Sequence, residues 1–246
     1  MAFILQKLVR LFSSLLFHLI PLLVFSVHVL SSALPAAVQT EEAEADSLLR
    51  WKASLDKSKP IFPVFLEYYA GRPCNWFDNF LTGTIPASIG NLTALPILYI
   101  QRNQLSGSLP QELGMLKFVT EIFFSENSLT GIIPISIGNL TNLWALYLDR
   151  NQLSGSIPQE IGMLRSLTEL ALSHNNLTGP IPTSIGNLTT LSYLYLTDNQ
   201  LSNSLPREIG KLTKLTRLFL EMNDLSGTLP LEMNNFTLLE AFIIFK

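Results

Sequence analysis

A 24-residue period, which runs from Asn79 to the end of the chain, constrains the fold more than any other feature. A leucine follows each period-marking asparagine by two residues and a proline by seven, and glycines follow most of them by four and eleven. Such self-similarity predicts a solenoid in which each unit packs mainly on its neighbours. The marking asparagines, which define offset 0, are Asn79, Asn103, Asn127, Asn151, Asn175, Asn199 and Asn223.

From Asn103 onward, each marking asparagine is preceded by a short segment in which apolar and outward-facing positions alternate. Apolar residues stand at offsets −8, −5 and −3, as Leu143, Leu146 and Leu148 do before Asn151. The last two alternate with outward positions, which predicts a short strand with one buried face. The asparagine amide can hydrogen-bond backbone groups where the strand ends. We expect the following Leu-Ser-Gly-Ser-Ile-Pro run to carry the chain round, because Gly permits positive φ and Pro fixes φ.

Residues 151–164, NQLSGSIPQEIGML, show the repeat almost unmodified. This pattern resembles the plant-type leucine-rich repeat over residues 79–246, and weakly over 41–78. The resemblance implies an α/β repeat solenoid, a right-handed superhelix with short parallel strands on its concave face and 3-10 or irregular turns on its convex face. Among plant proteins it is similar to the ectodomains of peptide-sensing receptor-like serine/threonine kinases. Receptor-like proteins and secreted polygalacturonase inhibitors share the same repeat.

Residues 1–37 read as a signal peptide, with an uncleaved signal anchor as the alternative. Lys7 and Arg10 precede a long apolar run, and small residues such as Ala33 and Ala36 follow it. Basic residues before an apolar stretch and a small-residue site are typical of secretory targeting. Both alternatives send the remaining chain into the secretory pathway, to the apoplast or the cell surface.

Residues 38–78 are expected to form an N-terminal cap that is partly deleted. The segment 41–55 reads as a helix with acidic residues at its start, which suits the helix dipole. Trp51 and Cys74-Asn75-Trp76 resemble the cap elements of the family, whose second cysteine is absent here. Since Cys74 is the only cysteine, no disulfide can form within the chain. Gly71 and Cys74 make a poor strand, so we expect the strand of one repeat to be missing.

Catalytic residue sets are absent from the sequence. His174 is the only histidine outside the N-terminal segment, so histidine-based metal clusters and triads lack members. Kinase signatures and Lys/Arg clusters are also absent, which argues against phosphoryl transfer and nucleic-acid binding by this chain. We therefore predict a binding module that is not an enzyme and needs no cofactor or metal.

Offset −4 predicts where a ligand would bind. Five of its seven residues are aromatic, and the strand pairing should place them side by side on the concave face. Aromatic side chains with mixed charged neighbours are typical of binding surfaces. Alternatively, the rings only stack on one another and stabilise the sheet. The predicted ligand-binding residues are Tyr99, Gln101, Arg102, Phe123, Tyr147, Asp149, Arg150, Tyr193, Tyr195, Asp198, Arg217, Phe219 and Glu221.

Five Asn-x-Thr sequons predict N-glycosylation if the chain is secreted. Four of them share offset 12, away from the predicted concave strands. The five asparagines are Asn91, Asn139, Asn176, Asn187 and Asn235.

Together these features predict an extracellular recognition module that binds a secreted peptide or protein partner, with a co-receptor as a further candidate. The resemblance implies a role in signalling or defence as part of a receptor-like kinase or receptor-like protein. Two alternatives stay open: a secreted inhibitor similar to polygalacturonase inhibitors, and a truncated product without function.

Overall fold

The computed structural model describes residues 74–75 and 81–244. The expected signal segment 1–37 and the expected cap helix 41–55 lie outside the described residues. Within the described part, each 24-residue frame contributes one strand to each of two parallel sheets and one 3-10 helix between them. This arrangement is the predicted repeat solenoid.

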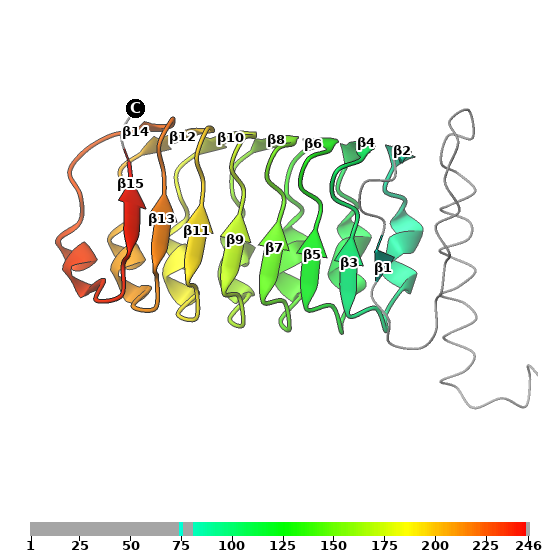
Figure 1. The fold of residues 1–246 in the computed structure, drawn as a ribbon, viewed down its shortest axis with the longest axis horizontal. Coiled ribbons are helices and arrows are strands. Elements are labelled where there is room, and N and C mark those ends of the chain that lie inside the picture. Colours follow the sequence, from blue (N-terminus) through cyan, green and yellow to red (C-terminus); the bar gives the residue numbers. More distant parts are fainter. Residues whose placement is uncertain (1–73, 76–80, 245–246) are drawn as a thin grey trace, which may run out of the picture. The chain divides into compact units, whose positions relative to one another are not determined.

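The first sheet contains the strands that precede the marking asparagines. Its eight strands lie side by side in chain order, and every neighbouring pair is parallel (Figure 1). They are β1 (Cys74–Asn75), β3 (Ile97–Tyr99), β5 (Glu121–Phe123), β7 (Ala145–Tyr147), β9 (Glu169–Ala171), β11 (Tyr193–Tyr195), β13 (Arg217–Phe219) and β15 (Ala241–Ile243). Strictly 24-residue register, as in Tyr147↔Ala171, brings equal offsets together across this sheet.

The segment after each asparagine, expected to be a turn, forms a second parallel sheet. The seven strands are β2 (Thr82–Thr84), β4 (Gln104–Ser108), β6 (Ser128–Gly131), β8 (Gln152–Gly155), β10 (Asn176–Gly179), β12 (Gln200–Asn203) and β14 (Asp224–Leu225). The expectation of a turn was incomplete because backbone groups of adjacent repeats can pair once the repeats are stacked. The glycine at offset 4 lies inside or next to these strands with positive φ, as Gly107 does at 75°.

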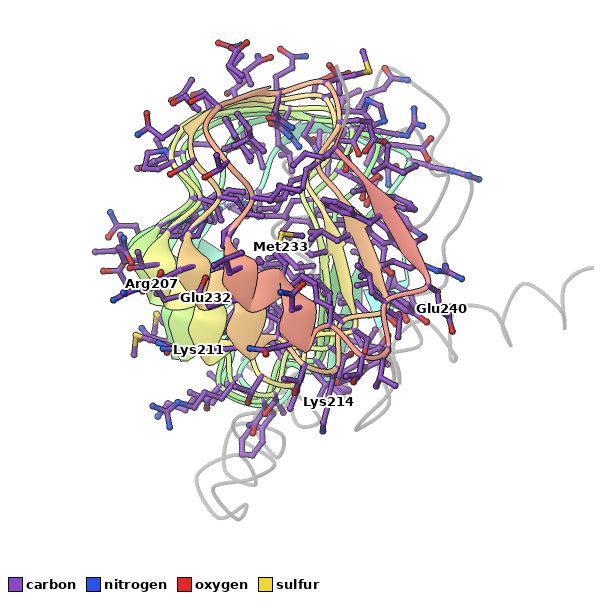
Figure 2. All side chains as sticks on the ribbon, turned by 90° about the vertical axis from the view of Figure 1, so that its left-hand side faces the viewer. Arg207, Lys211, Lys214, Glu232, Met233 and Glu240 are labelled. Carbon is purple, nitrogen blue, oxygen red and sulfur yellow. The ribbon has the colours of Figure 1, made fainter. Side chains whose placement is uncertain are left out.

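A 3-10 helix of five residues follows each proline at offset 7, as expected for the opposite face. Proline suits the position before the helix because its φ is fixed and it needs no hydrogen-bond acceptor. Viewed along the solenoid, these helices lie opposite the first sheet, with apolar side chains between them (Figure 2). They are η1 (Ala87–Asn91), η2 (Gln111–Met115), η3 (Ile135–Asn139), η4 (Gln159–Met163), η5 (Thr183–Asn187), η6 (Arg207–Lys211) and η7 (Leu231–Asn235).

One continuous apolar core runs between the sheets and the helices. Every repeat contributes the same positions, and most of these side chains are buried completely. Burying such a side chain stabilises the fold by about 1.5–3 kcal/mol relative to leaving it exposed. In the repeat around Asn151 the contributing residues are Leu143, Leu146, Leu148, Leu153, Ile157, Ile161 and Leu164.

The asparagine at offset 0 ties adjacent repeats together. The amide oxygen of Asn175 accepts a hydrogen bond from the backbone N–H of Leu153 in the preceding repeat, at 2.9 Å. Its amide nitrogen donates to the carbonyl of Leu148, also in the preceding repeat, and to two carbonyls of its own turn. The predicted bonding inside the turn is confirmed, and the bonds between repeats are an addition that only stacking could reveal.

The expectation that one strand is missing at the N-terminal side was wrong. Cys74 and Asn75 form β1, whose register partners on β3 are Leu98 and Tyr99. Each pair is separated by 24 residues, so β1 continues the repeat spacing. The sequence looked unfavourable because Gly71 and Cys74 lack large apolar side chains, but parallel pairing needs only backbone donors and acceptors.

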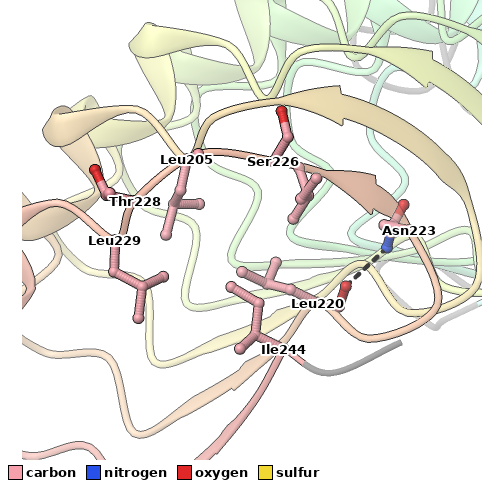
Figure 3. Close-up of a pocket in the computed structure, with 9 residues that line it drawn as sticks. Leu205, Leu220, Asn223, Ser226, Thr228, Leu229 and Ile244 are labelled. Atoms are coloured by element: carbon pink, nitrogen blue, oxygen red, sulfur yellow. Dashed lines mark hydrogen bonds between the residues drawn. The ribbon is translucent and has the colours of Figure 1, made fainter.

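The apolar residues of the last repeat are less buried than their equivalents in the earlier repeats. Leu229 is 50% exposed, whereas Leu205, its equivalent one repeat earlier, is 5% exposed. An open pocket of about 70 Å³ lies here, lined by residues that include Leu220 and Ile244 (Figure 3). Among the described residues, no helix has the length and apolarity needed to cross a membrane.

Candidate ligand-binding face

The predicted aromatic row forms two groups of contacting rings on the first sheet. Tyr99 meets Phe123 edge to face with centroids 4.6 Å apart, and Phe123 stacks on Tyr147 at 4.5 Å. In the second group, Tyr195 contacts Phe219 at 5.2 Å. These residues stand on consecutive strands because the pairing register keeps offset −4 aligned. All of them are only partly buried, so the rings both pack on one another and remain open to solvent.

Ala171 separates the two aromatic groups. It occupies offset −4 on β9, between Tyr147 on β7 and Tyr195 on β11, and it is only 3% exposed. The second group also holds a cation, since the guanidinium of Arg217 lies 5.1 Å from the ring centroid of Tyr193. A cation over an aromatic face is attracted by the ring quadrupole. The face therefore differs between its two halves.

Two glutamates that the sequence analysis did not select belong to this face. The hydroxyl of Tyr99 donates to Glu121, and the hydroxyl of Tyr147 donates to Glu169, in each case on the next strand. Both glutamates stand at offset −6, two residues before the aromatic row on the same sheet face. That alternation was the signal that could have identified them.

The tyrosine–glutamate pairs shift the tyrosine pKa values upward. Burial, together with the hydrogen bond and the charge of Glu121, raises the pKa of Tyr99 from 10.0 to about 12. Burial and the neighbouring Glu169 raise the pKa of Tyr147 as well. Ionising either phenol would place a second negative charge beside a carboxylate, which is unfavourable. Both hydroxyls therefore remain donors at neutral pH.

We expect these two tyrosines to resist ionisation in alkali. Both pKa values are raised in the folded state, so the contribution of each tyrosine to stability is complete below pH 10 and is lost as the pH rises through its folded pKa, which is about 12 for Tyr99. Ultraviolet absorbance of phenolate, followed during a pH titration, should show a late-ionising fraction. Tyr99→Phe should reduce that fraction and Glu121→Gln should shift it to lower pH. Ionisation of all tyrosines near pH 10 in the folded protein would contradict the assignment.

Polar pairs connect adjacent repeats beside the aromatic row. The hydroxyl of Ser125 donates to the carboxylate of Asp149 at 2.5 Å. Burial raises the pKa of Asp149, although this hydrogen bond opposes the shift. His174 Nδ1 lies 2.8 Å from Asp198 Oδ2, and both side chains are substantially exposed.

The residues at offset −1 share an uncommon backbone conformation. Each has φ between 53° and 57° although none is glycine. This left-handed conformation turns the chain out of the strand and costs roughly 1–2 kcal/mol per residue in isolation. Residue type does not reveal this conformation, because Arg, Glu, His, Asp and Met all occupy the position. The residues are Arg102, Glu126, Arg150, His174, Asp198 and Met222.

The register brings most predicted site residues onto one face. Tyr193 and Arg217 pair directly across β11 and β13. Arg102 forms an exposed ion pair with Glu126 at 3.3 Å. Glu221 carries a buried carboxylate oxygen without a hydrogen-bond partner among the described residues. Gln101, Asp149, Arg150 and Asp198 follow the strand ends, as expected from their offsets.

Potential metal ligands do not cluster into a metal-binding site in the described part of the chain. No group of three or more His, Cys, Asp or Glu residues there could hold a metal ion. The face therefore offers rings, hydroxyls, carboxylates and guanidinium groups, which suit non-covalent recognition.

Family comparisons agree with this architecture. Models of the leucine-rich repeat match residues 165–225, and residues 118–140 and 142–164. No curated protein sequence matches the chain significantly.

Several solved structures are similar to the chain. The plant peptide hormone receptor RGFR1, in complex with RGF2, is 39% identical and has a TM-score of 0.67 over 68% of this chain and 27% of that chain. PEPR1 with AtPEP1 is 32% identical, with a TM-score of 0.72 over 82% of this chain and 31% of that chain. The Arabidopsis receptor kinase HAESA, in complex with the peptide hormone IDA and the co-receptor SERK1, is 41% identical. Its TM-score is 0.61, over 67% of this chain and 27% of that chain.

The repeat models and the two-sheet solenoid identify this region as a leucine-rich-repeat domain. Domains of this kind are not catalytic. Its likeness to RGFR1, PEPR1 and HAESA places it with the plant receptor-like ectodomains of this family. The chain spans less than a third of the length of these three receptor chains.

Proposed function

We propose that the first sheet binds an extended peptide or protein segment secreted by plant cells, as the recognition part of a receptor-like kinase or receptor-like protein. The observation that carries the proposal is the aromatic row, whose rings contact one another yet stay partly exposed. Partly exposed aromatic side chains supply contact area at a low cost in conformational entropy, and they dominate many binding energies.

The length of the row supports an extended ligand. Offset −4 recurs on seven strands from β3 to β15. Since neighbouring strands lie about 4.8 Å apart, the row covers about 29 Å, which matches about nine extended residues. RGFR1, PEPR1 and HAESA, all similar to this chain, were solved with RGF2, AtPEP1 and the hormone IDA respectively. Peptide recognition is therefore the function that both the geometry and the relatives favour.

The two halves of the row carry side chains of opposite charge, which would fix the orientation of a bound peptide. The Tyr99 and Tyr147 half carries Glu121 and Glu169, whereas the other half carries Arg217 against Tyr193. Charge complementarity determines orientation and register more than it determines affinity. Substitutions in the two halves should therefore affect different parts of one bound peptide.

We expect Tyr147→Ala and Tyr195→Ala each to weaken peptide binding about 30-fold, the roughly 2 kcal/mol typical of truncating an aromatic hot spot. Nine-residue peptides selected from a random display library on the wild-type chain would serve as probes, and calorimetry would give their affinities. Phe118→Ala is the matched control, because Phe118 is 64% exposed but lies outside the row. Thermal unfolding monitored by circular dichroism would confirm that the variants fold. Unchanged affinity in both folded tyrosine variants would refute the proposed site.

A further inference from the structure

Charged side chains recur at offset −6 on three alternate strands of the first sheet. They are Glu121 on β5, Glu169 on β9 and Arg217 on β13, each 48 residues after the one before. The register places Ala145 between the two glutamates and Tyr193 between Glu169 and Arg217. Since neighbouring strands lie about 4.8 Å apart, the charged positions are separated by about 9.6 Å. Along the sheet, the charges are therefore negative, negative and positive at equal steps.

Tyrosine hydroxyls hold both carboxylates in place without neutralising them. Tyr99 donates to Glu121 and Tyr147 donates to Glu169, in each case to the same one of the two carboxylate oxygens. Neither glutamate forms an ion pair among the described residues. Ala145, which is buried, presents no long side chain between them. Each carboxylate thus keeps its charge and has one oxygen that can accept a hydrogen bond from a ligand.

The third position offers the opposite charge. The exposed Arg217 lies over the ring of Tyr193, with its guanidinium carbon 5.1 Å from the centroid, and donates a hydrogen bond to the side chain of Tyr195. The negative charge of Glu240, which directly precedes β15, also acts on Arg217. Because a guanidinium carries five N–H donors, the bond to one hydroxyl leaves donors for an acidic ligand group.

The spacing of these charges matches one peptide conformation. A polyproline II segment has three residues per turn and rises about 3.1 Å per residue, so residues i, i+3 and i+6 face the same way about 9.3 Å apart. In a β-strand, side chains on one face recur every second residue, at about 6.7 Å, which does not match steps of about 9.6 Å. Polyproline II segments are also the conformation that aromatic-lined surfaces commonly bind.

We propose that the peptide bound by the first sheet is a polyproline II segment with basic residues at i and i+3 and an acidic residue at i+6, facing Glu121, Glu169 and Arg217 respectively. The basic groups donate to the open carboxylate oxygens, and the acidic group accepts from the guanidinium. These charges fix register and orientation, while the aromatic row supplies contact area. The inference rests on the proposed peptide function and names the class of peptide.

The first test reads the sequences of nine-residue peptides selected from a random display library on the full chain. We expect enrichment of two basic residues three positions apart and an acidic residue three positions further, in either chain direction. On the Glu169→Lys variant, the middle basic residue should be replaced by an acidic one, because the substitution reverses the charge that faces it. A merely structural role for Glu169 would leave the selected charges unchanged.

The second test measures affinity for one selected peptide by calorimetry. Glu121→Gln and Glu169→Gln should each weaken binding about fivefold, the upper part of what a partly exposed ion pair contributes. In the Glu169→Gln variant, neutralising the facing peptide residue should cause no further loss. Glu160→Gln is the matched control, because Glu160 is also a partly buried glutamate but belongs to η4, outside the first sheet. Its affinity should equal that of the wild type.

The possible failures are distinguishable. Enriched peptides without this charge spacing, or identical charges selected on the wild type and on Glu169→Lys, would overturn the inference and leave peptide binding by the aromatic row intact. A selection that enriches no peptide would overturn the proposed function, and this inference with it. Circular dichroism of each variant establishes that it folds before its peptides are compared.

Discussion

Replacing Asn175 with Ala should lower the free energy of unfolding by about 3 kcal/mol, the upper part of the roughly 1–3 kcal/mol that a buried polar group left without its partner costs. The substitution deprives the backbone N–H of Leu153 of its acceptor. It also removes one of two donors from each of the carbonyls of Leu148, Leu172 and Ser173, which keep Asn151, Asn199 and the N–H of Arg150. These groups belong to two adjacent repeats, so the loss should separate the repeats and lower the cooperativity of unfolding. Urea titration followed by circular dichroism measures both effects.

The adjacent residue supplies the control for this prediction. Asn176 is exposed, and its side chain has no hydrogen-bond partner among the described residues. In unglycosylated protein, Asn176→Ala should change stability by less than about 0.5 kcal/mol, as surface substitutions usually do. Similar losses in the two variants would show that the hydrogen bonds of Asn175 do not hold the repeats together.

Replacing Gly162 with Ala should destabilise the chain by about 3 kcal/mol, at the upper end of the range for overpacking. A Cβ on Gly162 would lie 2.4 Å from the backbone oxygen of Ser184 and 2.7 Å from its Cβ. Both atoms belong to the next repeat, so the helices η4 and η5 would have to move apart. Chemical denaturation and native-state hydrogen exchange across these helices would measure the effect.

Gly179 supplies the contrasting case. Its φ is +75°, but an added Cβ would meet nothing closer than 3.7 Å. Glycine is therefore favoured at this position by its backbone conformation and not by a lack of space. Asn203 occupies the same offset one repeat later with φ of 66°. Since asparagine tolerates the left-handed region, Gly179→Asn should cost less than about 1 kcal/mol. If Gly179→Asn lowered the free energy of unfolding more than Gly162→Ala, the assignment of a steric role to Gly162 and a conformational role to Gly179 would be contradicted.

Much of the site could be predicted from spacing alone. A 24-residue period with alternating residues before Asn151 implies that Tyr147 and Phe123 stand at the same height on adjacent strands, and the register has this form. The roles of Glu121 and Glu169 were not apparent, because a hydrogen bond between neighbouring strands depends on side-chain direction. The exposure of Arg217 beside Tyr193 is likewise a property of the paired strands.

By itself, the sequence determined the repeat, its first sheet and the core positions of this protein, whereas the 3-10 face was implied by the resemblance to the plant-type leucine-rich repeat. These depend on local periodicity and on what Asn, Gly and Pro permit within one frame. Only the tertiary structure decided that the segment after Asn103 pairs as a second sheet, that β1 continues the first sheet at Cys74, and that Gly162 must lack a side chain. The physical reason is that these features arise between repeats, where backbone groups 22 to 24 residues apart come into contact only after stacking.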